Sequence, residues 1–175
     1  MSNLLTVSFN AASITGHIPE DIVKLIKLQN FLGCYMNGDG FSGPLPKDIG
    51  NMTELRLLCL GGNNFTGEIP RSISKLKRLF YLDLQNTPGM MHGNLNDLLS
   101  LPSISLLLVS GVKLRGTMPR VLSKKIGCLV LQGNEIEGTL PQIIPKGEML
   151  QVLNVANNQL TGDIPGDLLL LPNIK

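Results

Sequence analysis

The sequence predicts a single α/β solenoid, in which about seven copies of one short unit stack into a continuous core. A phrase built around a Gly and usually ending in Pro recurs along the whole chain of 175 residues. Hydrophobic residues make up 43% of the chain but aromatic residues only 4%, and Trp is absent. That composition indicates a core formed by one small aliphatic packing unit used repeatedly. The length suits one domain of ordinary size.

The recurring phrase has a regular spacing. Its seven instances read ITGHIP, FSGPLP, FTGEIP, MHGNLN, LRGTMP, IEGTLP and LTGDIP. Successive glycines are 22 to 27 residues apart, at Gly16, Gly43, Gly67, Gly93, Gly116, Gly138 and Gly162. A period in this range is typical of stacked repeats, each of which is one structural unit.

The third unit shows the physical role of each position. Leu58 and Leu60 alternate on one face of a short strand and point into the coil. Asn63 turns the chain inward, and its amide can bond buried backbone groups of neighbouring coils. Gly67 permits a backbone bend, and Pro70 suits the start of a short helical segment. The apolar residues that this segment turns inward are Ile73, Leu76 and Leu79.

The full phrase, LxxLxxLxLxxNxLxGxIP, resembles the plant-type leucine-rich repeats of receptor-kinase ectodomains and polygalacturonase-inhibitor proteins. The resemblance implies a right-handed superhelix with a parallel sheet on its concave side. Short second strands are expected near each Gly-x-Ile-Pro, and 3₁₀ or helical turns on the convex side. It also implies an extracellular module that binds a protein or peptide, without catalysis. Family ectodomains usually have cysteine-paired caps, which this chain lacks, so we expect residues 1–175 to be an uncapped excerpt of a longer array.

Two units depart from the family pattern at the Asn position, where Thr87 stands in the fourth unit and Val112 in the fifth. The side chain of Val112 has no amide group, so we expect the ladder of Asn side chains to be interrupted there. Asn134 in the sixth unit follows the inward Leu129 and Leu131. We expect it to support the fold more than any surface residue nearby.

The strand register of the second unit is ambiguous, because Phe31 and Leu32 can each begin the inward pair. We expect Leu32 and Cys34 to point inward, since that register places Asn37 at the Asn position.

Cys34, Cys59 and Cys128 are interpreted as isolated thiols, too few and too scattered for a disulfide framework or a zinc site. Isolated thiols favour a reducing compartment, and the first residues do not resemble a signal peptide. The alternative to a receptor-type module is therefore an intracellular structural or scaffolding repeat protein. The strings NMT at Asn51 and NFT at Asn64 are glycosylation candidates if the chain is secreted, and otherwise incidental products of the repeat.

No motif indicates a catalytic, metal or cofactor site. The string NGDGFSG matches GxGxxG, but PLP follows where a dinucleotide site needs a helix to begin. His17 and His92 are solitary. The net charge of +2 gives no field for nucleic acid, and the longest apolar run is too short to cross a bilayer.

In each unit the residues before, between and just after the inward strand pair should face the open concave sheet, and we expect a ligand there. The candidates are Leu57, Cys59, Tyr81, Asp83, Gln85, Leu106, Leu108, Cys128, Val130, Gln132, Val152 and Asn154. Most are apolar, which indicates contact with a protein or extended peptide that has an apolar ridge, with Tyr81 as an anchor. There are two alternatives. Either aliphatic residues stand here only because they suit strands, or a second copy of the chain covers these apolar residues. Uncapped ends around Leu5, Val7 and Ile174 also predict self-association.

Overall fold

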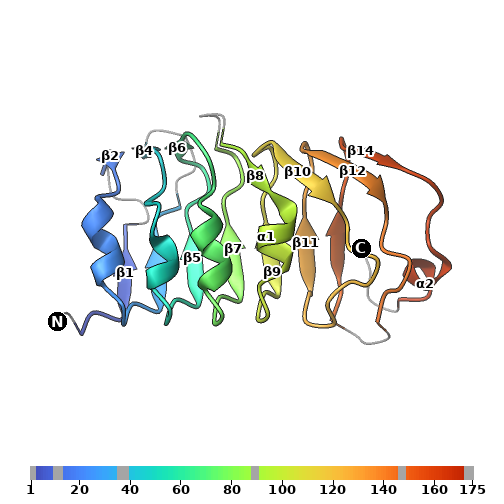
Figure 1. Cartoon of the computed structure of the whole chain (residues 1–175), viewed down its shortest axis with the longest axis horizontal. Helices are drawn as coiled ribbons and strands as arrows, with labels where there is room; N and C mark the ends of the chain where they lie inside the picture. The colour runs from blue at the N-terminus through green and yellow to red at the C-terminus, as the bar shows by residue number, and fades with distance from the viewer. Residues whose placement is uncertain (1–2, 10–13, 35–39, 88–90, 146–148, 172–175) are drawn as a thin grey trace.

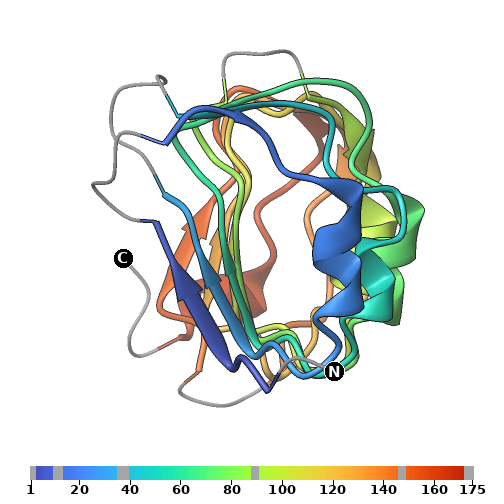
Figure 2. The ribbon, with the colours of Figure 1, turned by 90° about the vertical axis from the view of Figure 1, so that its left-hand side faces the viewer.

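Seven parallel strands form one continuous sheet along the molecule in a computed structural model (Figure 1). The model describes residues 3–9, 14–34, 40–87, 91–145 and 149–171. The strands pair in chain order, one from each unit, and we call them the main sheet. They are β1 (Thr6–Ser8), β3 (Asn30–Leu32), β5 (Leu57–Cys59), β7 (Tyr81–Asp83), β9 (Leu106–Leu108), β11 (Cys128–Val130) and β13 (Val152–Asn154). Viewed along the axis, the main sheet lies on one side of the coil and the helical segments on the other (Figure 2).

Short second strands follow the main strands, which confirms the expectation from the repeat phrase. They form a three-stranded sheet in the order β2-β4-β6 and a four-stranded sheet in the order β14-β12-β10-β8. Their bounds are Gly16–His17 (β2), Phe41–Gly43 (β4), Asn64–Phe65 (β6), Gly93–Asn94 (β8), Leu114–Thr117 (β10), Glu135–Thr139 (β12) and Gln159–Thr161 (β14). The bend that each repeat glycine permits is visible at Gly67, whose φ is +78°.

The opposite side carries one short helical segment in most units. These are the 3₁₀ segments η1 (Glu20–Lys24), η2 (Ile49–Asn51) and η3 (Arg71–Lys75), and the α-helical turns α1 (Leu95–Leu99) and α2 (Gly166–Leu169). The described residues between β10 and β11, and those between β12 and β13, form no helix. Val121 and Ile143 make a parallel bridge there instead, and the Leu122 N–H donates to the Ile143 carbonyl at 3.1 Å. The chain between Pro119 and Leu129 is two residues shorter than that between Pro70 and Leu82.

The core is one cluster of mainly aliphatic hydrophobic side chains that runs through the coils. The central residue of each main strand points into it. These residues are Val7, Phe31, Leu58, Leu82, Leu107, Leu129 and Leu153, of which the five middle ones are buried. Each buried row is shared by neighbouring units, so no unit forms this core alone.

The strand register of the second unit differs from the register that we expected. Phe31, not Leu32, points inward, and it is 2% exposed and pairs with Leu58 of the next strand. Leu32 pairs with Cys59 on the other face of the sheet, and Cys34 also lies on that side, bonded to Cys59. The prediction of Leu32 and Cys34 inward was therefore wrong.

The physical reason is the pairing of Gly33 with Phe41. Gly33 takes the second inward position, and the Phe41 ring fills the space that a side chain would occupy. A Cβ on Gly33 would lie 2.9 Å from the Phe41 ring. The two inward positions of this unit are thus Phe31 and Gly33, so the usual Leu-x-Leu pattern is absent from its sequence. Asn37, the other part of that prediction, lies outside the described residues.

Asn134 satisfies buried backbone groups of two coils, as its position predicted. Its Nδ2 donates to the carbonyls of Val109 at 2.9 Å and Leu131 at 2.8 Å. Its Oδ1 accepts from the N–H groups of Val112 at 3.2 Å and Leu114 at 2.9 Å. Val112 is itself buried and apolar, so the ladder of amide side chains is interrupted at that coil. Similar bonds are formed by Asn63 and Asn158.

Candidate ligand-binding face

The first and third residues of each main strand point away from the core and form what we call the outer face. Two of its rows run across five strands in register. The rows are Leu57, Tyr81, Leu106, Cys128, Val152, and Cys59, Asp83, Leu108, Val130, Asn154. All ten are residues that strand alternation predicted for this face. Their role in binding a ligand stays a prediction.

Most of these side chains are half-buried, because neighbours in the same row shield one another. Leu57, Leu106, Leu108 and Val130 each present only part of their apolar surface to solvent. The apolar residues of the two rows therefore form a partly exposed surface, which we call the apolar stripe and which Asp83 interrupts on β7. No pocket is needed to accommodate a partner on such a surface.

Polar side chains border the stripe beyond the strand ends. Gln85 is half-buried and Gln132 is exposed. The amide of Asn154 donates to Oε1 of Gln132 at 3.1 Å, which links the last two described coils across this border. A ligand on the stripe would meet amide donors and acceptors along one edge.

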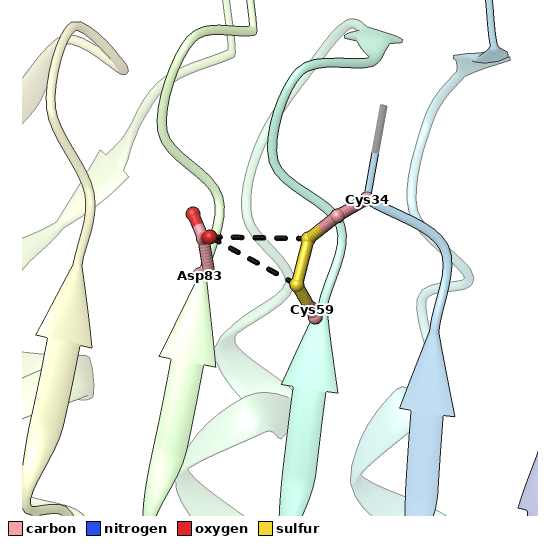
Figure 3. Close-up of side chains that lie close together, drawn as sticks. All are labelled: Cys34, Cys59 and Asp83. Carbon is pink, nitrogen blue, oxygen red and sulfur yellow. Dashed lines mark hydrogen bonds between the residues drawn. A yellow bond between two sulfur atoms is a disulfide. The ribbon is translucent and has the colours of Figure 1, made fainter. Parts of the chain in front are cut away.

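A disulfide between Cys34 and Cys59 crosses the outer face (Figure 3). The two Cα atoms are 5.4 Å apart, within the ordinary range for a disulfide. The prediction of isolated thiols was wrong for this pair. A separation of 25 residues is about one repeat, so the two cysteines meet on neighbouring coils. Cys128 is a free, half-buried thiol whose pKa is raised by burial, which makes it a weak nucleophile at neutral pH.

Asp83 lies beside this disulfide, and only 7% of its surface is exposed. Its Oδ1 accepts the N–H of Gln85 at 3.1 Å. Its Oδ2 lies 3.5 Å from the hydroxyl of Tyr81. The same oxygen lies 3.8 and 3.9 Å from the sulfurs of Cys34 and Cys59 (Figure 3). Disulfide sulfurs carry no hydrogen to donate, so the sulfur contacts are van der Waals contacts. Burial raises the pKa of the Asp83 carboxyl, and the bond from Gln85 only partly opposes this.

The space for this carboxylate exists because Gly61 stands beneath it. A Cβ at Gly61 would lie 2.6 Å from Oδ1 of Asp83. Asp83, Cys34 and Cys59 also bring three potential metal ligands within 4.8 Å of one another. The sequence interpretation held these cysteines too scattered for such a group. As a disulfide, however, the sulfurs are not thiolates, and thiolate is the form that binds metal.

The comparisons with known proteins agree with the repeat fold. A family model described as Leucine Rich Repeat matches residues 54–76 and 149–171. The crystal structure of a TDR receptor is 27% identical with a TM-score of 0.74, over 94% of this chain and 28% of that one. The chain therefore contains leucine-rich repeats, and its fold is a leucine-rich-repeat solenoid similar to that of the TDR receptor.

Two further structures resemble this leucine-rich-repeat chain. The Arabidopsis receptor kinase HAESA, in complex with the peptide hormone IDA and the co-receptor SERK1, is 24% identical with a TM-score of 0.76. That match covers 98% of this chain and 33% of the other. The ectodomain of the receptor kinase SOBIR1 from Arabidopsis thaliana is 31% identical with a TM-score of 0.57, over 65% and 59% of the two chains. The chain thus spans about a third or less of the TDR and HAESA chains.

The two glycosylation candidates lie away from the outer face of this leucine-rich-repeat chain. Asn51 ends η2 and Asn64 begins β6, and both residues are exposed. Glycans at these positions would leave the apolar stripe uncovered. Within the described ranges, no helix is long and apolar enough to cross a membrane.

Proposed function

We propose that this leucine-rich-repeat chain binds an extended peptide or protein segment along the outer face of the main sheet, without catalysis. The observation that carries the proposal is the apolar stripe, which runs across neighbouring main strands and is covered by no other helix or strand among the residues that the structure describes. Exposed strands usually carry polar side chains, and a contiguous apolar surface commonly marks a contact site. Main-sheet strands repeat at a regular spacing, so an extended ligand would meet a similar row of side chains on every coil.

The related structures support the same class of ligand. HAESA was crystallised with the peptide hormone IDA, and another similar structure is the plant peptide hormone receptor RGFR1 in complex with RGF2. Tyr81 is the aromatic residue of the stripe, and aromatic residues often dominate the energy of an interface. It remains our candidate anchor.

An extracellular location fits this proposal better than the intracellular scaffold. The thiol argument for a reducing compartment no longer applies to Cys34 and Cys59, since disulfides persist mainly in oxidising compartments. Mass spectrometry of natively produced protein separates the two locations. Glycans on Asn51 or Asn64 would place the chain in the secretory pathway, and bare asparagines with reduced cysteines would favour the scaffold.

Selection from a displayed library of random peptides, about twelve residues long, tests the proposed face. We expect the selected peptides to lose affinity for the double variant Leu106→Glu, Val130→Glu, because two charges would interrupt the stripe. The matched control is Val121→Glu, Ile143→Glu. Those two apolar residues are 50% and 44% exposed on another part of the coil. Both variants should keep the circular dichroism of the parent. Selected peptides that bind the first variant as tightly as the parent would contradict the proposal.

A further inference from the structure

We propose that Asp83 selects ligands that present a Lys or Arg side chain between apolar residues. The inference rests on the proposed binding face and specifies the chemistry that this face recognises. Asp83 is the only acidic or basic residue in the two outer-face rows. Its neighbours in those rows are Tyr81 on its own strand, Cys59 on β5 and Leu108 on β9.

The carboxylate lacks a cationic partner among the residues that the structure describes. None of the ion pairs formed by these residues includes Asp83. Among the described residues, the hydroxyl of Tyr81 is the only donor near Oδ2, at the long distance of 3.5 Å, since the disulfide offers none. A buried carboxylate with so few donors is destabilising until a donor reaches it.

A cationic side chain of the ligand would supply that donor. An ammonium or guanidinium group above Oδ2 would form a charge-assisted hydrogen bond in a site that is largely shielded from water. The long aliphatic stem of Lys or Arg would at the same time lie along half-buried residues such as Leu108. An acidic or phosphorylated segment would instead meet like charge and be rejected.

The other role of Asp83 is structural, and it can be separated from the charge. Oδ1 accepts the N–H of Gln85, a bond that holds the chain just after β7. Asn has the same shape and retains a carbonyl oxygen for that bond. The variant Asp83→Asn therefore removes the charge and keeps the local structure.

The test is a double-mutant cycle with one selected peptide that contains Lys. Calorimetry would measure four affinities. The parent and Asp83→Asn would each be titrated with the original peptide and with a peptide in which norleucine replaces Lys. We expect each single change to weaken binding about tenfold or more. The two changes together should weaken it no further than either alone, because both remove the same contact. The control Asp167→Asn, an exposed residue of α2, should bind like the parent.

The outcomes separate this inference from the proposed function. If the peptides lose affinity for the double variant Leu106→Glu, Val130→Glu but bind Asp83→Asn as tightly as the parent, the role of Asp83 is overturned and the binding face stands. Peptides unaffected by both variants would overturn the binding face itself. The norleucine peptide changes no residue of the protein. If it binds the parent as tightly as the Lys peptide, the role of Asp83 is overturned even where the Asn variant fails to fold.

Discussion

Asn134 and Asp83 are polar residues with little exposure, yet their hydrogen bonding differs. All four hydrogen bonds of Asn134 reach backbone groups within about 3 Å, so its burial is fully compensated. Asp83 has one bond of ordinary length and faces the outer surface of the sheet. The first pattern is that of a residue which supports the fold. The second is that of a residue available to a partner.

Asn134→Ala should lower the free energy of unfolding by about 1–3 kcal/mol, because it leaves buried backbone groups unpaired. Urea denaturation followed by circular dichroism measures this change. The exposed Asn51→Ala serves as the control and should differ from the parent by no more than about 0.5 kcal/mol. Equal stability of the parent and Asn134→Ala would show that the ladder does not support this coil.

Asp83→Asn should alter how stability depends on pH. Burial raises the pKa of Asp83 in the folded chain above its ordinary value, so the folded state holds this proton more readily than the unfolded state. The group therefore favours folding below its unfolded pKa, and this contribution is lost as the pH rises through the folded value. The variant cannot titrate, so its stability relative to the parent should increase from about pH 3 to pH 7. Urea midpoints across that range check this, and a constant difference would contradict it.

At the scale of the elements, the sequence predicted most of the fold and less of the site. The period and the Leu-x-Leu pairs predict the strands and their inward residues, because alternation leaves one choice where both positions are aliphatic. That logic fails in the second unit, where Gly33 leaves the second inward position empty and Phe41 fills it from elsewhere in the coil. The disulfide was missed for a related reason. Cys34 and Cys59 are far apart in the sequence, but they are separated by about one repeat. Stacking of the repeats therefore brings them together in space, which their sequence positions alone do not show.

Replacing Cys34 and Cys59 by Ser should destabilise the chain by about 3.5 kcal/mol, the chain-entropy value for closing a loop of this length. Urea denaturation of the double variant gives this number, and the parent in dithiothreitol should behave similarly. Cys128→Ser is the matched control, since that thiol is free and half-buried, and it should change stability little. A parent that is insensitive to reductant would show that the disulfide does not form.

The whole molecule is a row of coils whose shared core leaves apolar residues at both ends. Leu5 is 50% exposed near the first coil, and Leu169 and Leu170 are 74% and 77% exposed near the last. Self-association through these ends stays a prediction, which light scattering tests across a range of concentrations. We expect the apparent mass to rise with concentration and to fall when polar caps are fused to the chain. A monomer at high concentration without caps would contradict it.

Methyl NMR of the chain with a selected peptide tests the central claim most directly. Leu106, Leu108 and Val130 point to the outer face, whereas Leu107 and Leu129 point into the core between them. If the outer face binds, the methyl signals of the first three should shift most on titration, and the buried pair less. Val121 and Ile143, on the bridge after β10 and β12, should not shift. The largest shifts at those two residues, with the outer-face methyls unchanged, would contradict binding at the main sheet.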